Sequence, residues 1–292
     1  MAHPLATGRR PSTIADLLGT GAMRLDKCSD SARLDAELLL AHLLDKPRSF
    51  LLTWPQQRID EALIPEYDSL IARRAGGEPL AYLTGRKEFW SLTLRVNRHT
   101  LIPRPETEHL VEQALALLPT EKGCRVADLG TGSGAIALAL ARERSHWQIV
   151  ACERCPEALG TARANASELK LDNVEFRRSD WCAALARDEA FDLIVANPPY
   201  VRHGDPRLAE DVLRFEPQAA LIAGPEGLED LRTIARQAKC HLYPGGWLLL
   251  EHGDDQEQAV TELLRQEAYR EIADRRDYGG RPRLTMARWE GV

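Results

Sequence analysis

The tetrad Asn197-Pro198-Pro199-Tyr200 is the segment whose residue types most directly suggest chemistry, and it follows an apolar run over 191–196. Its prolines fix φ at about −65° and lack N–H groups, so the Pro198 carbonyl has no competing local donor. Asn197 adds a side-chain carbonyl, and two such acceptors can hold both hydrogens of one –NH2 group, directing its lone pair at an electrophilic carbon. We therefore interpret Asn197 and Pro198 as catalytic, and the whole tetrad as the binding site of a planar amine or amide. The alternative is a Pro-Pro turn closed by a buried tyrosine.

A glycine-rich segment, Gly130-Thr131-Gly132-Ser133-Gly134, lies between an apolar strand pattern over 125–129 and a helical pattern over 136–142. Such a turn lets backbone amides approach a nucleotide closely. Its G-x-G-x-G spacing lacks the Gly-Lys-Ser/Thr of a P-loop, which argues against an ATP or GTP site. Glu153 stands 23 residues after Gly130, at the end of the next predicted strand, where a carboxylate can accept hydrogen bonds from both ribose hydroxyls. The sequence thus indicates a nucleoside site; a glycine turn that only packs helix on strand is the alternative.

The chemistry around this loop favours S-adenosylmethionine among nucleoside ligands. The loop contains no lysine and follows Asp128, so it suits an uncharged or cationic group better than a pyrophosphate. Asp180 and Trp181 follow a third predicted strand and fit the edge and the face of an adenine. The residues assigned to the cofactor are Gly130, Thr131, Gly132, Ser133, Gly134, Glu153, Trp181 and Asn197, the last counted with both sites.

The elements expected to position these residues change character near residue 85. Before it, apolar residues recur three and four positions apart around 14–18, 34–43 and 63–71, which is typical of helices. Alternation over 89–96 predicts a short strand or hairpin. After it, strands are expected at 125–129, 148–152, 174–178, 191–196 and 247–250, and helices at 136–142, 156–170 and 228–238.

This order predicts the α/β fold class, because strands that alternate with helices form a parallel sheet. We expect a small helical-bundle domain over 1–84, a β-hairpin linker over 85–100, and a Rossmann-like domain with a mostly parallel sheet over 101–292. The catalytic and cofactor residues all fall in the third segment.

Composition and charge limit the classes of protein that this chain can be. Its 38 Lys and Arg against 44 Asp and Glu give a net charge of −6, so no overall basic field favours a nucleic-acid backbone. No apolar run reaches the roughly 18 residues that cross a bilayer, and residues 1–13 lack the apolar core of a secretory signal. The six scattered cysteines and eight histidines form no metal-binding array. We expect a cytoplasmic monomer with reduced thiols, without a metal, a membrane partner or a direct nucleic-acid substrate.

Several further motifs carry a resemblance to a known family. They are Glu78-Pro79-Leu80-Ala81-Tyr82-Leu83-Thr84-Gly85, Glu88-Phe89-Trp90, Leu101-Ile102-Pro103-Arg104-Pro105-Glu106-Thr107-Glu108, Phe215-Glu216-Pro217, and Asp277-Tyr278 with Gly280-Arg281. Together with the glycine loop and the tetrad, they make the chain resemble the class I S-adenosylmethionine-dependent methyltransferases. Within that class it resembles the HemK family, the release factor glutamine methyltransferases, essentially from end to end.

The resemblance implies methylation of N5 of the glutamine in the Gly-Gly-Gln loop of peptide chain release factors. It also implies that the helical N-terminal domain helps to dock the release factor. By matching position, Gly130 to Gly134 line the methionine part of the cofactor, Glu153 the ribose and Trp181 the adenine side, while Asn197 to Tyr200 grip the substrate amide. The family more often has aspartate in the place of Glu153, which keeps the carboxylate and lengthens its reach.

Three other functions stay open at this point. A sister group methylates glutamine in a ribosomal protein, but it carries a different sequence in place of Pro103 to Thr107. DNA and RNA base amino-methyltransferases share a similar tetrad, yet they need a basic groove or a recognition domain. A non-catalytic cofactor sensor would have no use for Asn197. Arg104 is left between a ligand-binding role and an ion pair with Glu106 or Glu108.

Overall fold

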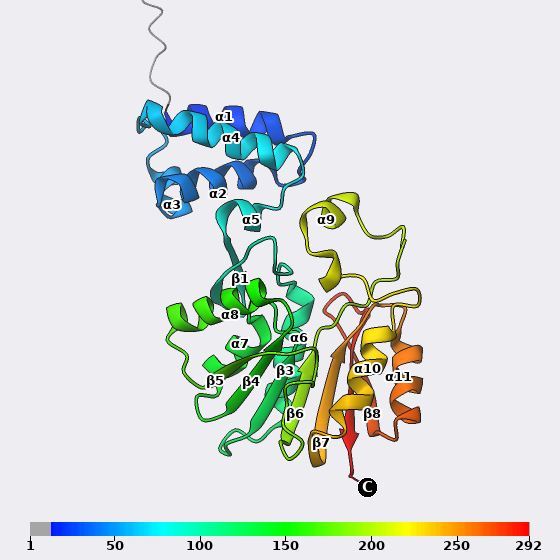
Figure 1. Ribbon diagram of the computed structural model, residues 1–292. Helices are drawn as coiled ribbons and strands as arrows, with labels where there is room; N and C mark the ends of the chain where they lie inside the picture. The colour runs from blue at the N-terminus through cyan, green and yellow to red at the C-terminus, as the bar shows by residue number, and fades with distance from the viewer. Residues whose placement is uncertain (1–12, 292) are drawn as a thin grey trace, which may run out of the picture. The chain divides into compact units, whose positions relative to one another are not determined.

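The computed structural model describes residues 13–291, and the chain divides into two compact units, Met1–Gly85 and Arg86–Val292 (Figure 1). Each unit has its own hydrophobic core, because the buried apolar clusters draw their residues from one unit or the other. Within the part of the chain described, no helix is long and apolar enough to cross a bilayer.

The smaller unit is built from helices. They are α1 (Ile14–Leu25), α2 (Ala32–Leu44), α3 (Arg48–Thr53), α4 (Ile64–Ala75) and α5 (Leu80–Thr84), with a 3-10 turn η1 at Glu61–Leu63. A capping box begins α1: the Thr13 hydroxyl accepts from the Asp16 N–H, and the Asp16 carboxylate accepts from the Thr13 N–H. Ile14, Leu18 and Leu25 share one face of α1 and are buried in the core with residues of α2 and α4.

The larger unit begins with a two-stranded antiparallel hairpin, β1 (Arg86–Phe89) and β2 (Leu92–Arg95). Its other strands are β3 (Arg125–Leu129), β4 (Gln148–Glu153), β5 (Val174–Arg178), β6 (Phe191–Ala196), β7 (Leu242–Glu251), β8 (Arg270–Arg276) and β9 (Pro282–Trp289). Its helices are α6 (Glu108–Leu117), α7 (Ala135–Glu143), α8 (Pro156–Leu169), α9 (Glu210–Phe215), α10 (Glu229–Ala238) and α11 (Glu257–Gln266), with 3-10 turns η2 (Pro105–Thr107) and η3 (Gln218–Ala220).

These seven strands form one sheet in the order β5-β4-β3-β6-β7-β9-β8. The first five pair in parallel, and β9 and β8 complete the sheet in antiparallel pairs. From β3 the chain first adds β4 and β5 on one side and then β6 and β7 on the other. The carboxyl ends of β3 and β6 therefore flank the point where strand order reverses, and open α/β sheets bind their ligands at such a point.

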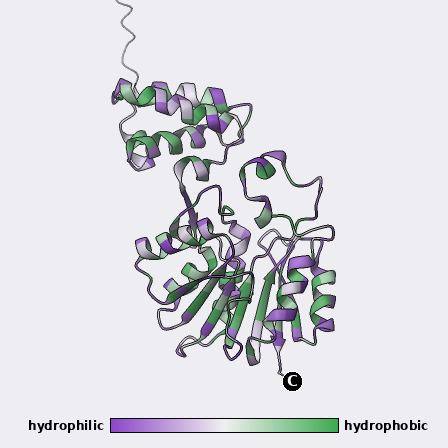
Figure 2. Cartoon of the chain, in the orientation of Figure 1, coloured by the Kyte–Doolittle hydropathy of each residue, from purple (hydrophilic) through white to green (hydrophobic). Residues whose placement is uncertain are grey.

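Helices cover both faces of this sheet (Figure 1). On one face α6 packs against β6 and β7, α7 packs against β3 and β4, and Phe89, Leu92 and Leu94 of the hairpin are buried in the same core. On the other face α10 packs against β7, and α11 packs against β8 and β9. The central strands are apolar along their length (Figure 2), as expected when both faces of a strand are buried.

The fold class predicted from the sequence is confirmed, and the differences concern single elements, most of them near the end of the chain. The strand expected at 247–250 extends over Leu242–Glu251, because a register shift accommodates Pro244 and Gly245 at its start. The sequence analysis did not predict helices α6, α9 and α11 or strands β8 and β9. Six of the seven residues of β8 are polar or alanine, so this edge strand has little of the alternation that marks a buried strand.

Candidate active site

A pocket opens at the carboxyl ends of β3, β4 and β6 and contains most of the predicted site residues. The predicted residues that line it are Gly130, Thr131, Gly132, Ser133, Glu153, Trp181, Asn197 and Pro199. Gly134, Pro198 and Tyr200 do not line it. Asp180 and Arg104, for which the sequence suggested ligand contacts, also line it, and so do His99, Thr107, Pro217 and Ala220, to which the sequence assigned no role.

The glycine loop owes its shape to backbone conformations that glycine permits. Gly130, Gly132 and Gly134 have φ of 78°, 57° and 88°. The N–H groups of Gly130 and Thr131 both donate to the Cys152 carbonyl at 2.9 Å, which ties the loop to β4. A Cβ on Gly130 would lie 3.1 Å from the Trp181 ring, so the missing side chain makes room for the tryptophan. Gly134 caps α7 and positions the helix start rather than the pocket wall.

Asp128, near the end of β3, is hydrogen-bonded to this loop and to the first turn of α7. Its Oδ2 accepts hydrogen bonds from the Thr131 hydroxyl at 2.6 Å and from the Ala137 N–H at 3.1 Å. Its Oδ1 is buried without a hydrogen-bond partner among the described residues. Burial raises the pKa of Asp128 to about 7, although both hydrogen bonds act to lower it.

Glu153 is held at the end of β4 by backbone donors. Its Oε2 accepts from the Gly132 N–H at 3.0 Å, and its Oε1 accepts from the Cys155 N–H at 2.8 Å. Each carboxylate oxygen can accept more than one hydrogen bond, so the group keeps capacity for a pair of hydroxyl donors. Trp181, with φ of 47°, is half-buried and lines the same pocket, as does the preceding Asp180.

The tetrad follows β6 directly, as the sequence predicted. Asn197 Nδ2 donates to the Thr107 hydroxyl oxygen at 3.1 Å, and no hydrogen bond among the described residues uses Asn197 Oδ1. An acceptor is thereby available at the pocket wall. The Tyr200 hydroxyl donates to Glu251 Oε1 at 3.3 Å, while Gln256 Nε2 donates to the Tyr200 carbonyl at 3.0 Å.

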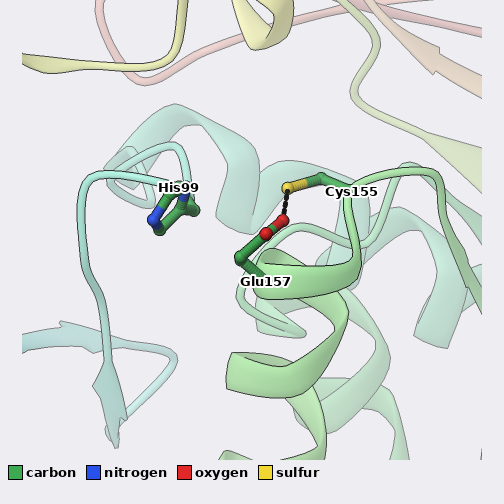
Figure 3. A group of neighbouring side chains, drawn as sticks. All are labelled: His99, Cys155 and Glu157. Atoms are coloured by element: carbon green, nitrogen blue, oxygen red, sulfur yellow. Dashed lines mark hydrogen bonds between the residues drawn. The ribbon is translucent and has the colours of Figure 1, made fainter.

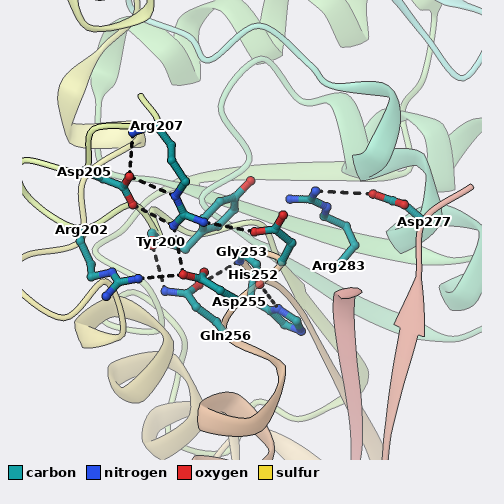
Figure 4. Close-up of polar contacts among 11 residues, drawn as sticks. Tyr200, Arg202, Asp205, Arg207, His252, Gly253, Asp255, Gln256, Asp277 and Arg283 are labelled. Carbon is teal, nitrogen blue, oxygen red and sulfur yellow. Dashed lines mark hydrogen bonds and ion pairs between the residues drawn. The ribbon is translucent and has the colours of Figure 1, made fainter. Parts of the chain in front are cut away.

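Ion pairs fasten the segment after Tyr200 to the loop after β7. Arg202 and Arg207 both bind Asp255, at 2.7 Å and 3.0 Å, and Arg207 also binds Asp205 at 2.8 Å (Figure 4). The Gly253 N–H donates to Gln256, which in turn holds the Tyr200 carbonyl. The side of the site expected to bind the substrate thus depends on two loops that are about 50 residues apart in the chain.

Arg104 lines the pocket and has an ion-pair partner that the sequence did not indicate. Its guanidinium pairs with Glu216, a buried residue, and with neither Glu106 nor Glu108. Glu216 also accepts a hydrogen bond from the Ile102 N–H at 3.0 Å. The following Pro217 and Ala220 line the pocket, so this pair joins two segments of its wall.

One group of potential metal ligands lies at the pocket rim. Figure 3 shows His99, Cys155 and Glu157, whose ligand atoms all lie within 4.8 Å of one another. The Cys155 thiol donates to Glu157 Oε2 at 3.2 Å, so these two groups already satisfy each other. All six cysteines are free, and Cys152 is buried in β4 with a raised pKa caused by its burial. The C-x-x-C spacing therefore places its two sulfurs in different environments.

The comparisons with known proteins agree with this geometry. A family model described as the PrmC N-terminal domain matches residues 16–85, and one described as a methyltransferase domain matches residues 120–279. The release factor glutamine methyltransferase of Shewanella oneidensis is 46% identical over 281 residues, covering 96% of this chain and 98% of that protein. The chain belongs to the release factor glutamine methyltransferase family. Another member, from Pseudomonas aeruginosa, is 52% identical over 261 residues, covering 89% of this chain and 94% of its own length.

Solved structures support the fold assignment. The crystal structure of a methyltransferase from Pyrococcus furiosus matches with a TM-score of 0.53 at 18% identity, covering 78% of this chain and all of that chain. Family membership confirms the resemblance drawn from the motifs and makes the chain a methyltransferase. Two residues next to the tetrad carry no functional signal of their own in the sequence. Thr107 belongs to a family motif without an assigned role, and Glu251 simply ends an apolar strand, although its carboxyl group contacts Tyr200.

Proposed function

We propose that this chain transfers the methyl group of S-adenosylmethionine to the N5 side-chain amide nitrogen of the glutamine in the Gly-Gly-Gln loop of peptide chain release factors. The observation that carries the proposal is the free Asn197 Oδ1 at the pocket wall, with Nδ2 held by Thr107. Relatives that carry this activity in their name match nearly the whole chain.

The pocket residues fit S-adenosylmethionine by their chemistry. The loop amides around Gly132 and the Glu153 carboxylate suit a ribose, and the flat face of Trp181 suits an adenine. Asp128 and Glu153 bring no positive charge to the site, which favours a sulfonium over a polyphosphate. When bound, this cofactor supplies an electrophilic methyl group on sulfur, and no metal is needed for that chemistry.

The tetrad supplies what an amide nucleophile needs. An amide nitrogen is a poor nucleophile because its lone pair is delocalised into the carbonyl. Asn197 Oδ1 and the Pro198 carbonyl can accept its two hydrogens, which orients the nitrogen and increases its electron density. Pro199 and the ring of Tyr200 would cover the planar amide. These hydrogen bonds strengthen as positive charge develops on nitrogen, so they act chiefly in the transition state.

Each of the three predicted segments has a proposed role in this reaction. Residues 1–84 dock the release factor, 85–100 form the linking hairpin, and 101–292 carry the catalytic and cofactor residues. Translation takes place in the cytoplasm, so the enzyme acts there, as a monomer and without a nucleic-acid substrate. Partly buried salt bridges of the smaller unit, such as that of Arg74 with Asp35 at 2.7 Å, stiffen the helices that would bear the docking surface.

Mass spectrometry of a release factor tests the proposal. The purified factor is incubated with this protein and S-adenosylmethionine, and its Gly-Gly-Gln peptide is searched for one added methyl group. A methyl on that glutamine is the expected result, with an Asn197→Ala sample as the control for carry-over modification. If the glutamine carries no methyl group and the label appears instead on a ribosomal protein or on nucleic acid, the chain is still a methyltransferase but the proposed substrate is wrong.

A further inference from the structure

Glu251 is the last residue of β7, and its carboxyl group is buried next to Tyr200 with only 1% of the residue exposed. Its Oε1 accepts the Tyr200 hydroxyl at 3.3 Å. Its Oε2 is buried and has no hydrogen-bond partner among the described residues. A buried carboxyl group costs folding free energy unless its oxygens are used, so a group with one idle oxygen beside the tetrad calls for a functional reason.

Thr107 connects this carboxyl group to Asn197. The Thr107 hydroxyl is near enough to Glu251 to lower the pKa of that carboxyl, although the structure shows no hydrogen bond between the two groups. Its oxygen accepts Asn197 Nδ2 at 3.1 Å, and Thr107, although only 4% exposed, lines the pocket. The Thr107 hydroxyl has a single hydrogen to donate. If Glu251 receives that hydrogen, the Thr107 oxygen faces Asn197 as an acceptor only, and it can bind Nδ2 but not Oδ1 of Asn197.

We propose that Glu251 is a positioning residue for the methyl transfer, an inference that rests on the proposed function. An ionised carboxylate only accepts hydrogen bonds, so Glu251 holds the hydroxyl hydrogen of Tyr200 on Oε1 and, in this proposal, draws that of Thr107 toward its idle Oε2. The Thr107 oxygen is then left to accept Asn197 Nδ2, and the Asn197 carbonyl is turned toward the pocket. One carboxylate thereby fixes both ends of the tetrad, the amide direction at Asn197 and the ring position at Tyr200.

The groups that face Glu251 come from three other parts of the chain. Arg283 of β9, whose Nε is buried without a hydrogen-bond partner among the described residues, favours the ionised carboxylate. Burial opposes ionisation more strongly, and Glu106 of η2 adds to it, so the pKa of Glu251 is raised to about 7. Burial also raises the pKa of the Tyr200 hydroxyl, which keeps it a donor. Protonation near neutral pH would give Glu251 a hydrogen to donate and disturb the direction of these bonds.

Glu251→Gln is the first test, because its –NH2 group can donate to the Thr107 oxygen. The Thr107 hydroxyl is then free to donate to Asn197, which reverses the amide. With saturating cofactor and a purified release factor, we expect kcat to fall about tenfold and KM to change by less than about twofold. Wild-type kcat should decline as the pH falls below about 7, and the variant should lack this acid limb.

A pair of Thr107 variants isolates the hydroxyl. Thr107→Val keeps the shape and removes the hydroxyl, so kcat should fall about tenfold; Thr107→Ser keeps the hydroxyl and should restore most of it. Glu189→Gln is the control for loss of a buried acid. Glu189 pairs with Arg125 and Arg177 near the start of β6, at the opposite end of that strand from the tetrad, so kcat should stay at the wild-type value.

An unchanged kcat and pH profile in Glu251→Gln would overturn the inference, as would equal losses in the two Thr107 variants. If Glu251→Gln does not fold, judged by thermal unfolding and cofactor binding, the Thr107 pair decides. If wild-type protein binds S-adenosylmethionine but leaves the release factor unmodified, the proposed function fails instead. The positioning role is then read from the Asn197 side-chain amide by 15N NMR, where Glu251→Gln must shift its signals and Glu189→Gln must not.

Discussion

Asp128 and Glu251 are both buried carboxyl groups near the carboxyl end of a sheet strand, but they are held in different ways. Asp128 on β3 bonds to Thr131 and Ala137, three and nine positions along the chain. Glu251 on β7 bonds to Tyr200, 51 positions away, and lies beside Thr107, 144 positions away. The first anchors one loop, whereas the second joins three separate segments.

The same contrast divides the whole site. The side assigned to the cofactor is held by backbone groups of neighbouring loops, as when the Gly132 N–H donates to Glu153. The side assigned to the substrate is held by side chains, as when Asn197 donates to Thr107. Backbone geometry is fixed once the strands pair, but a chain of side chains can be broken at any one member. Variants on the two sides should therefore fail in different ways.

Asn197→Ala should give the largest effect and separate the two sides. Loss of an acceptor that acts in the transition state is expected to lower kcat by about 10² to 10³-fold. The dissociation constant of S-adenosylmethionine should stay within about threefold of wild type, because the cofactor residues are held independently. Single-turnover methylation and isothermal titration calorimetry measure the two quantities. Parallel losses in both would break the division between the sides.

Glu153→Gln should give the converse pattern. The two backbone donors, Gly132 and Cys155, each face one carboxylate oxygen, and a glutamine can satisfy only one of them. We expect the dissociation constant of S-adenosylmethionine to rise about tenfold to a hundredfold, with kcat at saturating cofactor nearly unchanged. Glu175→Gln, an exposed carboxylate of β5 that pairs with Arg177, is the matched control and should bind the cofactor normally. A fall in kcat alone would place Glu153 on the substrate side.

The sequence predicted the side of the site that is held by local backbone groups better than the side that is held by distant side chains. The glycine loop and Glu153 were found because their signal is local, a short spacing between two strand patterns. The tetrad was found because its residues adjoin. Thr107 and Glu251 have no fixed sequence spacing from Asn197 or Tyr200. The pairing of β6 with β7 brings Glu251 to the tetrad, and the packing of α6 against these two strands brings Thr107 there. The predicted ion pair of Arg104 with Glu106 or Glu108 was wrong for the same reason, because its partner Glu216 lies 112 positions away in the chain.

Removal of residues 1–84 should have a smaller effect, confined to protein substrates. The larger unit keeps its own cores, so the truncated chain should fold and bind cofactor. We expect KM for a full-length release factor to rise about tenfold, while kcat/KM for a short peptide with Gly-Gly-Gln stays the same. Steady-state assays with both substrates measure the difference. Equal efficiency of the two chains on the full-length factor would remove the docking role from the helical unit.

The smallest effect concerns stability and returns to the two buried acids. Both have a pKa of about 7, above the usual values of 3.8 for Asp128 and 4.5 for Glu251, so folding favours their protonated forms. Their contribution to stability is full below the usual pKa and is lost as the pH rises to about 7. Glu251→Gln removes that loss but weakens the bond from Tyr200, so the net gain in free energy of unfolding at pH 8 relative to pH 5 should be on the order of 1 kcal/mol. Urea unfolding of the variant and of wild type at both pH values measures this difference in the free energy of unfolding.

Two outcomes separate the possible roles of Glu251. If the variant is more stable than wild type above pH 7 but slower in methyl transfer, Glu251 serves the reaction at the expense of the fold. If the variant loses stability at both pH values, Glu251 is a structural residue like Asp128.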